Sequence, residues 1–246
     1  MITYTNSDQS VALVATDALS LLRQLPTGSV QLGVSDPPWN TGCRQDLNGV
    51  GYEDSYPDFK AFLYPVLQEY HRVVSGITII HMGISEAHYV KVWMDEIWGR
   101  KRFQGELIMS SELGRGASTK GWSQKHSHLF IYGPDGHFNP EHLPTTFRKA
   151  AKPGYGEDKP VTSVLTVNLS TSDPQRVGYP GQKALSLLMS LIQCYSKTGH
   201  LVLDTFCGSG VTADAAYRTG RRVITCDTNP QSIDITRQRL SLSLQV

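Results

Sequence analysis

The sequence predicts an α/β protein built on a doubly wound, mostly parallel sheet. Short apolar runs alternate with helical periodicity along most of the chain, which is typical of parallel strands joined by helical crossovers. Two of the apolar runs lead into a turn at an aspartate, at Asp36 and at Asp204. Because open α/β sheets bind ligands at the carboxyl ends of their strands, we expect a site at these two positions.

The amino-terminal half of the chain predicts strands and helices in alternation. Apolar runs indicate buried strands, and apolar residues three or four positions apart indicate helices. The expected elements are, in order, a strand at 11–15, a helix spaced on Leu19, Leu22 and Leu25, a strand at 30–34, a long loop over 40–57, a helix over 58–74, a central parallel strand at 77–82 and a helix over 85–98. Long loops in compact domains usually serve a site or lack order.

The carboxy-terminal half returns to this alternation after an irregular stretch. Strands at 106–110 and 128–132 are expected to pair as an antiparallel edge. Between 133 and 180 the periodicity fails and prolines alternate with basic residues, which indicates an inserted recognition segment. After it we expect, in order, a helix at 182–197, a strand at 201–206, a tight turn at 207–210, a helix at 211–219 and a strand at 223–227.

Composition argues against several classes of protein. The 246 residues include no apolar run of roughly 18 residues or more, so a membrane-spanning helix is not expected. The first residues contain neither a basic leader nor the apolar core of a secretion signal, and the four cysteines lack the paired spacing of a zinc site. We therefore expect a cytoplasmic protein with reduced cysteines and no metal ion.

Positive charge is concentrated in the middle of the chain, although the formal net charge is only +1. Residues 100–159 carry 10 Lys and Arg against 6 Asp and Glu, whereas residues 1–99 carry 5 against 11. Binding to phosphates requires local positive charge. The middle segment is therefore expected to face a polyanion, unless the asymmetry is that of an ordinary solvated surface.

A glycine-rich turn follows the strand that ends at Asp204. The turn contains Gly208 and Gly210, and a second strand ends at Asp227, at the separation at which an acidic residue accepts hydrogen bonds from ribose hydroxyls. Ala213 stands where dinucleotide-binding turns have a third glycine, and no phosphate-binding lysine follows. The pattern favours a nucleoside without phosphates, such as S-adenosylmethionine, over a dinucleotide or ATP.

The sequence Ser35-Asp36-Pro37-Pro38-Trp39-Asn40 directly follows an apolar strand. Two successive prolines fix the backbone and remove two N–H donors, so Asp36 is held in one orientation. A carboxylate beside an aromatic ring suits methylation of an amino group on a planar base. Taken alone, the same residues also fit a rigid turn with a capping aspartate and a core tryptophan.

Three segments together resemble the β group of amino-methylating DNA methyltransferases, a circularly permuted family with a Rossmann-like sheet. Asp36-Pro37-Pro38-Trp39-Asn40-Thr41-Gly42 is similar to the D-P-P-Y/W loop in its adenine-modifying form. Residues 204–212 (DTFCGSGVT) resemble the cofactor motif D-P-F-x-G-S-G-T-T, and residues 178–185 (GYPGQKAL) resemble the H-P-T-Q-K-P-L segment. The chain departs from the pattern at Thr205 and Ala184, each in place of a proline, and at Gly181, in place of threonine.

The resemblance implies roles for individual residues. Asp36, Pro37, Pro38 and Trp39 would form the catalytic loop, in which Trp39 stacks on a flipped base while Asp36 and the Pro37 carbonyl accept its amino hydrogens. S-adenosylmethionine would be bound by Asp17, Asp36, Lys183, Asp204, Phe206, Gly208, Gly210 and Asp227. Asp17 would contact the adenine and Asp227 the ribose, although Asp17 judged alone is a helix N-cap.

The resemblance and the charge pattern also predict how the chain is divided. Residues 1–111 and 161–246 would form the methyltransferase core, and residues 112–160 an insert that recognises the DNA target or, alternatively, a flexible solvated insert. The expected DNA-binding residues are Asn40, Arg115, Lys120, Lys125, Arg148 and Lys149. Two histidines in this range, His126 and His128, lack a third metal ligand.

The predicted function is transfer of a methyl group from S-adenosylmethionine to the N6 amino group of adenine in double-stranded DNA. Methylation of the N4 amino group of cytosine is the nearest alternative. A catalytically inactive DNA-binding or partner subunit, and methylation of RNA or a small molecule, are alternatives from other classes. Expected associations are a homodimer and a cognate restriction endonuclease that need not bind the chain.

Overall fold

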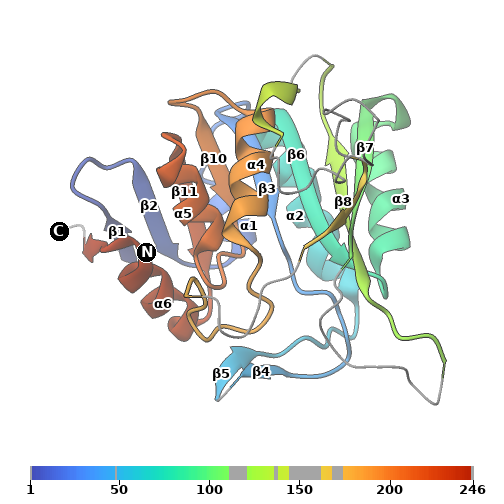
Figure 1. Ribbon diagram of the computed structural model, residues 1–246, viewed down its shortest axis with the longest axis horizontal. Coiled ribbons are helices and arrows are strands. Elements are labelled where there is room, and N and C mark those ends of the chain that lie inside the picture. Colours follow the sequence, from blue (N-terminus) through green and yellow to red (C-terminus); the bar gives the residue numbers. More distant parts are fainter. Residues whose placement is uncertain are drawn as a thin grey trace, which may run out of the picture.

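The computed structural model describes residues 2–47, 49–110, 121–135, 138–143, 162–167 and 174–244. Within these ranges the chain forms a ten-stranded sheet in the order β12-β1-β2-β11-β10-β3-β6-β8-β7-β9, together with a separate hairpin, β4-β5 (Figure 1). The strands are β1 (Ile2–Thr5), β2 (Val11–Ala15), β3 (Val30–Ser35), β4 (Gln45–Leu47), β5 (Val50–Tyr52), β6 (Val74–Gly83), β7 (Phe103–Ser110), β8 (His126–Tyr132), β9 (Val164–Thr166), β10 (Leu201–Asp204), β11 (Arg222–Asp227) and β12 (Ser243–Leu244).

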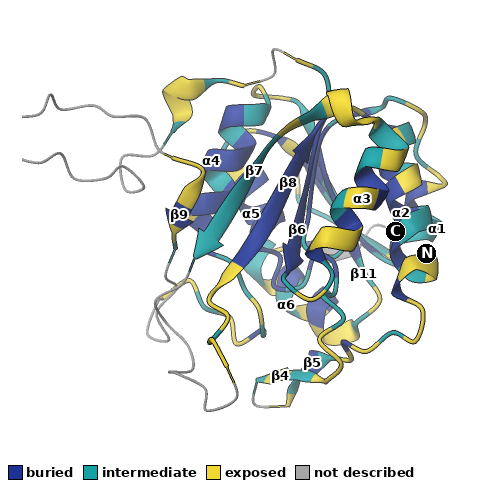
Figure 2. Cartoon of the chain, turned by 90° about the vertical axis from the view of Figure 1, so that its right-hand side faces the viewer, coloured by how far each residue is buried: buried dark blue, intermediate teal, exposed yellow. Residues whose placement is uncertain are grey.

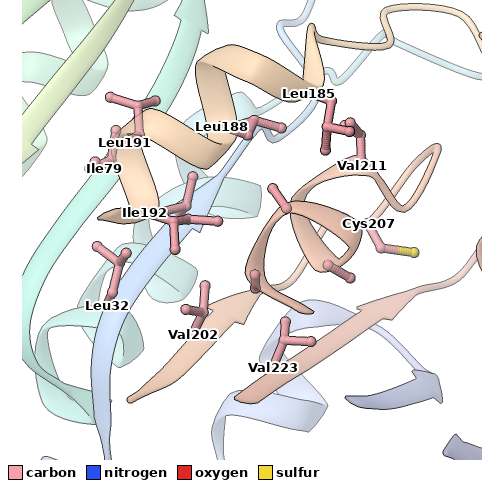
Figure 3. Packing of buried hydrophobic residues seen from close by; sticks show 14 of the residues in the cluster. Leu32, Ile79, Leu185, Leu188, Leu191, Ile192, Val202, Cys207, Val211 and Val223 are labelled. Carbon is pink, nitrogen blue, oxygen red and sulfur yellow. The ribbon is translucent and has the colours of Figure 1, made fainter. Parts of the chain in front are cut away.

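Helices cover both faces of the sheet, which confirms the doubly wound α/β class. They are α1 (Ala18–Leu22), α2 (Phe59–Val73), α3 (Ala87–Trp98), α4 (Leu185–Tyr195), α5 (Val211–Arg218) and α6 (Pro230–Leu240), with short 3₁₀ turns η1 (Arg100–Arg102) and η2 (Pro140–His142). Successive strand residues point to opposite faces, so Ile79 packs in the cluster under α4 and α5, whereas Ile80 packs in the cluster under α2 and α3. Figure 3 shows the first of these clusters.

The five central strands β2, β11, β10, β3 and β6 are parallel. The elements of the glycine turn therefore lie between β2 and β3, although they come last in the sequence. The two ends of the chain meet at the opposite edge of the sheet from β9, where β1 pairs antiparallel with β12. This arrangement brings the carboxyl ends of strands from both halves of the sequence to one end of the sheet.

The expected antiparallel pairing of residues 106–110 with 128–132 is confirmed, with Ile108 opposite His128. The two strands are not the edge of the sheet, however, because the three-residue strand β9 pairs parallel to β7 on its outer side. β8 lies within the range 112–160 that the sequence analysis assigns to an insert, yet it is a buried strand between β6 and β7 (Figure 2). At least residues 126–132 therefore belong to the sheet, and target recognition by the rest of the range stays a prediction.

Several elements were not expected from the sequence. Residues 40–57 were predicted to be a loop, but they contain the hairpin β4-β5, whose Gly51 N–H donates to the Gln231 side chain of α6. The sequence analysis also did not anticipate β1, β9, β12 and α6. No helix among the described residues is both long and apolar enough to cross a membrane.

Candidate active site

A pocket of about 640 Å³ opens at the carboxyl ends of the parallel strands. Cavities of roughly 300–1,000 Å³ hold small-molecule ligands in proteins. Its lining residues come from both halves of the chain, including Asp36 and Tyr52 from the first half and Lys183, Asp204 and Gly208 from the second. The acidic loop after β3 and the glycine turn after β10 therefore share one cavity.

The glycine turn is shaped by close contact with the helix that follows β11. Gly210 adopts a left-handed backbone conformation with φ 72°, and a Cβ atom at this position would lie 2.7 Å from the Thr236 hydroxyl of α6. The Gly208 N–H donates to Asp227 Oδ2 at 3.0 Å, and the Ser232 hydroxyl donates to the same oxygen at 2.7 Å. Asp227 thus fixes the turn, its Oδ1 accepts from the Asn229 N–H, and the residue lines the pocket.

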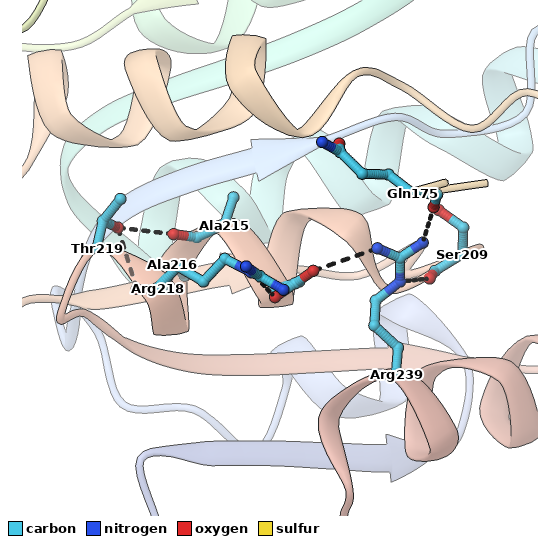
Figure 4. A network of polar contacts seen from close by, with 8 residues as sticks. Gln175, Ser209, Ala215, Ala216, Arg218, Thr219 and Arg239 are labelled. Atoms are coloured by element: carbon cyan, nitrogen blue, oxygen red, sulfur yellow. Dashed lines mark hydrogen bonds and ion pairs between the residues drawn. The ribbon is translucent and has the colours of Figure 1, made fainter. Parts of the chain in front are cut away.

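Arg239 of α6 is hydrogen-bonded to the backbone of the glycine turn (Figure 4). Its Nε donates to the Ser209 carbonyl at 2.8 Å, and its two terminal nitrogens donate to Asp214 of α5 and to the Gln175 carbonyl. Both charged side chains are more than nine-tenths buried. One guanidinium therefore joins α5, α6, the turn and the segment that leads to Lys183.

Asp204, at the end of β10, is buried although it lines the pocket. Its Oδ1 accepts from the Ser35 hydroxyl at 3.0 Å and from the Phe206 N–H at 3.1 Å. Burial raises the pKa of this carboxyl to about 6. The carboxylate thus connects the two strand ends on which the acidic loop and the glycine turn are built.

Asp36 receives contacts on both carboxylate oxygens. Oδ1 accepts from the Trp39 indole N–H at 3.0 Å and lies 3.3 Å from His81 Nδ1. Oδ2 accepts from the Lys183 ammonium group at 2.5 Å, and the same ammonium donates to the Gly181 carbonyl at 2.8 Å. A residue predicted to bind the cofactor, Lys183, therefore forms an ion pair with the residue predicted to bind the base.

Trp39 is held at the edge of the site, and in the described structure it does not line the pocket. One part of its ring lies against Gly83, where any side chain would overlap it. The His81 ring packs edge-on against the Trp39 ring, with 5.3 Å between the ring centroids. Lys183 Nζ lies 4.8 Å from the centroid of the Trp39 ring. A stacking base would therefore have to replace Lys183 over this ring.

The rest of the acidic loop is folded around a second carboxylate, that of the buried residue Asp54. Asp54 accepts from the backbone N–H groups of Asn40 and Thr41 and from the Thr41 hydroxyl, at 2.7–3.2 Å. The Asn40 side chain donates to Glu86 and accepts from the Tyr56 N–H. The Asn40 amide thus helps to shape the loop, and its expected contact with DNA stays a prediction.

Asp17 combines the two roles that the sequence analysis left open. Its Oδ1 accepts from the Ser20 N–H at 2.9 Å, so it is the N-cap of α1. Hydrogen bonding from the Ser20 side chain, together with this N–H, lowers the pKa of the carboxyl. The residue also lines the pocket. Capping is therefore observed, and contact with a cofactor stays a prediction.

The charges of the pocket fit a cation. Among the described residues that line it, the acidic ones are Asp17, Asp36, Glu53, Asp204 and Asp227, and the only Lys or Arg is Lys183. This excess of carboxylates would repel phosphate groups and attract a sulfonium. The residues present therefore fit S-adenosylmethionine better than a nucleotide.

The predicted DNA-binding residues of the middle segment cannot be placed relative to this site. Arg115, Lys120, Arg148 and Lys149 lie outside the described residues. Lys125 is described and exposed, just before β8, and the nearby Trp122 is 96% exposed. Contact of Lys125 and of the four residues outside the described ranges with DNA stays a prediction.

Several residues of the site were missed by the sequence analysis. Asp54 and Tyr52 lie in the range interpreted as a loop, and His81 lies in an apolar strand. Tyr179 lies within the recognised segment 178–185 but was given no role there. The signal that could have found His81 is its place as the one ionisable residue of an otherwise uncharged, buried strand, β6.

Comparison with known proteins supports the interpretation of this pocket. A family model described as DNA methylase (N6_N4_Mtase) matches residues 30–238. The DNA adenine methyltransferase YhdJ of Escherichia coli (strain K12) is 25% identical over 254 residues, which cover 96% of this chain and 84% of the relative.

Two solved structures share the fold over most of their length. The PvuII DNA methyltransferase (cytosine-N4-specific) superposes with a TM-score of 0.73 at 14% identity, covering 93% of this chain and 86% of the other. The M1.HpyAVI-SAM complex superposes with a TM-score of 0.65 at 18% identity, covering 94% and 98%. At these identities the likeness establishes the fold alone.

Proposed function

We propose, from the premise that this chain belongs to the N6_N4_Mtase family of DNA methylases, that it methylates the N6 amino group of adenine in double-stranded DNA. Membership makes the chain an S-adenosylmethionine-dependent DNA amino-methyltransferase. The choice of adenine and the roles of individual residues are our proposal.

The observation that carries the proposal is the shared pocket of the acidic loop and the glycine turn. The Asp36 carboxylate and the Gly208–Gly210 turn line the same cavity, although they lie about 170 positions apart in the sequence. Holding a methyl donor and an amino acceptor in one place converts a bimolecular reaction into an effectively unimolecular one. The pocket is thus suited to transfer between two bound molecules.

S-adenosylmethionine, when bound, supplies an electrophilic methyl group on a positively charged sulfur. Asp227 and the glycine turn would hold its nucleoside, and the acidic lining would favour its sulfonium. Lys183 would leave Asp36 and pair with the amino acid carboxylate of the cofactor. This exchange makes Asp36 Oδ2 and one face of Trp39 accessible to a base.

The chain's own residues would then orient the target amino group. An exocyclic amino group inside a duplex is inaccessible, so the base must be flipped out, at a cost of a few kcal/mol. Asp36 Oδ2 and the Pro37 carbonyl would accept the two amino hydrogens, and Trp39 would stack on the base. Asp36 also offers a place for the proton that the nitrogen loses when it gains a methyl group.

Adenine is favoured over cytosine by the residues around the loop. The loop begins with aspartate and continues with Asn40, Thr41 and Gly42, the form that resembles adenine-modifying enzymes. A relative that covers 96% of this chain bears the name DNA adenine methyltransferase. A structure that shares the fold is cytosine-N4-specific, so the fold by itself does not decide between the two bases.

The alternative of an inactive subunit rested on departures from the family pattern, and one of these, Thr205, lines the pocket. The structure accommodates this residue, because its N–H donates to Ser35 and Tyr70, as no proline could. Its hydroxyl also lies 3.0 Å from the Tyr70 hydroxyl. A homodimer and a cognate restriction endonuclease stay predictions.

The test is to identify the methylated nucleoside. Duplex DNA is incubated with the protein and isotopically labelled S-adenosylmethionine, digested, and analysed by mass spectrometry. We expect labelled N6-methyladenine and no N4-methylcytosine, and the reverse result would refute the choice of adenine. Asp36→Ala should abolish transfer while calorimetry still detects cofactor binding. Absence of cofactor binding by the wild type would favour the inactive subunit.

A further inference from the structure

His81 is a buried, ionisable side chain at the centre of the site for which the mechanism above has no role. It lies near the carboxyl end of β6 and is 5% exposed. Ser35, the last residue of β3, is paired with Ile80 of β6, so His81 stands beside Asp36 on the neighbouring strand. Its position thus follows from the register of the two central parallel strands.

Ser127 completes the arrangement from the other side. β8 runs antiparallel to β6 with Leu129 opposite His81 and Ser127 opposite Gly83, so Ser127 is a diagonal neighbour of His81 on the same face. The Ser127 hydroxyl lies 2.7 Å from His81 Nε2, and Ser127 is 3% exposed. The three side chains Ser127, His81 and Asp36 therefore form a continuous polar chain across β8, β6 and the end of β3.

The protonation of the His81 ring can be deduced from its surroundings. Burial lowers the pKa of His81 to about 3, while Asp36 and Lys183 act on it in opposite directions, so the ring is neutral. A neutral ring carries one proton, on either nitrogen. Nδ1 lies 3.3 Å from Asp36 Oδ1, and a lone pair there would face a carboxylate oxygen. The proton is therefore on Nδ1, and Nε2 accepts from the Ser127 hydroxyl.

The same ring also contacts the other proposed base-binding side chain. The His81 and Trp39 rings pack edge to face, with 5.3 Å between their centroids and an interplanar angle of 68°. Trp39 in turn donates its indole N–H to Asp36 Oδ1, the oxygen that His81 faces. Oδ1 thus accepts from Trp39 and faces His81 Nδ1, whereas Oδ2 is paired with Lys183 and can be offered to a substrate once that side chain leaves.

We propose that His81, oriented by Ser127, is a positioning residue that fixes the Asp36 carboxylate and the Trp39 ring so that Oδ2 faces the amino group of the target base. This inference rests on the proposed function, because it assumes that Asp36 binds that amino group. The Asp36 carboxylate fixes the ring tautomer, and the Ser127 hydroxyl, which donates to Nε2, fixes the orientation of the ring. Lys183, which must leave Asp36 before a base can bind, is then paired with Oδ2.

Two substitutions of similar size separate the two nitrogens. In His81→Asn the amide nitrogen can occupy the place of Nδ1 and still donate to Asp36, whereas in His81→Gln it reaches only the place of Nε2. We expect His81→Asn to keep kcat within about threefold, and His81→Gln to lower kcat by about 10- to 100-fold, the usual cost of losing an outer partner. Ser127→Ala should lower kcat by about tenfold.

Binding of the cofactor should not change in any of these variants, so calorimetric Kd values for S-adenosylmethionine near that of the wild type are expected. His71→Gln, in which the replaced ring packs on Trp98 away from the pocket, is the matched control and should behave like the wild type. Equal losses of kcat in His81→Asn and His81→Gln, or no loss in His81→Gln, would overturn the proposal.

A measurement on the wild type tests the tautomer without any turnover. Nuclear magnetic resonance of the ¹⁵N-histidine-labelled protein should show a protonated Nδ1 and an unprotonated Nε2 for His81. Ser127→Ala should keep this tautomer but shift the Nε2 resonance, because that nitrogen loses its hydrogen-bond donor. The opposite tautomer would overturn the proposal even if the enzyme methylates adenine. Conversely, the expected tautomer in a protein that methylates no amino group would refute the proposed function. It would leave the arrangement of Ser127, His81 and Asp36 as described.

Discussion

The two sides of the pocket are held in different ways. The glycine turn is fixed mainly by residues that follow it closely in the sequence, namely Asp227 at the end of β11 and Ser232 and Thr236 of α6. The acidic loop is instead fixed by single side chains from separate elements, namely Asp54 and His81 together with Glu86. The comparison suggests that cofactor binding depends on local backbone shape, whereas orientation of the base depends on long-range polar contacts.

The largest expected effect is on the turn. Gly210→Ala should weaken binding of S-adenosylmethionine by about 100-fold or more, because the new Cβ would press on Thr236 and displace the turn. The matched control is Gly199→Ala, which has a similar positive φ of 80° but no atom within 4 Å of the added Cβ. Both variants should lose roughly 1–2 kcal/mol of stability through backbone strain, measured by denaturant unfolding.

Cofactor affinity measured by calorimetry then separates the two glycine variants. We expect Gly199→Ala to bind like the wild type, because its site lies at the far end of β10, before Leu201. If Gly210→Ala and Gly199→Ala bound the cofactor equally well, cofactor binding would not depend on the backbone shape of the glycine turn.

The second prediction concerns the loop. Asp54→Asn keeps the shape of the side chain but places an amide where two carboxylate oxygens accept from Asn40 and Thr41. We expect kcat for DNA methylation to fall by about 10- to 100-fold, since a displacement of about 1 Å near a reacting group has effects of this size. Cofactor affinity should stay unchanged.

The control for this substitution is Asp46→Asn in the hairpin β4-β5. The Asp46 side chain is 40% exposed and accepts from the Gly49 N–H. Its substitution therefore removes the same charge as Asp54→Asn without altering the contacts of Asn40 and Thr41. Loss of cofactor affinity in Asp54→Asn, at unchanged kcat, would contradict the assignment of cofactor binding to the glycine turn and of base orientation to the acidic loop.

The same difference explains how much the sequence could predict. The glycine turn could be recognised because Asp204, Gly208, Gly210 and Asp227 lie within 24 consecutive positions and each has a conformational or hydrogen-bonding reason to be there. The parallel direction of β10, β11 and β3 followed from the alternation of strands and helices, whereas their order in the sheet did not. Local patterns were therefore sufficient for the central parallel strands and for one side of the pocket.

The supports of the acidic loop gave no comparable pattern. Asp54 lies 14 positions from Asn40 and Glu86 lies 46 positions away, so their partnership exists only in the folded chain. The hairpin β4-β5 was interpreted as a loop because its residues are polar and rich in glycine. Its contacts with Asn229 and Gln231, almost 180 positions later, are what hold it beside the pocket.

The smallest expected effect is at Asp17, which lies where the two descriptions overlap, since it caps α1 and lines the pocket. Asp17→Ser keeps a capping oxygen for the Ser20 N–H but withdraws the carboxylate, so unfolding free energy should change by less than about 0.5 kcal/mol. Asp17→Ala removes the cap as well and should cost about 1 kcal/mol. If Asp17 also contacts the cofactor, both variants should weaken S-adenosylmethionine binding by the same threefold to tenfold, about 1 kcal/mol. Unchanged affinity in Asp17→Ser would restrict this residue to capping and confine cofactor recognition to the glycine turn and its immediate partners.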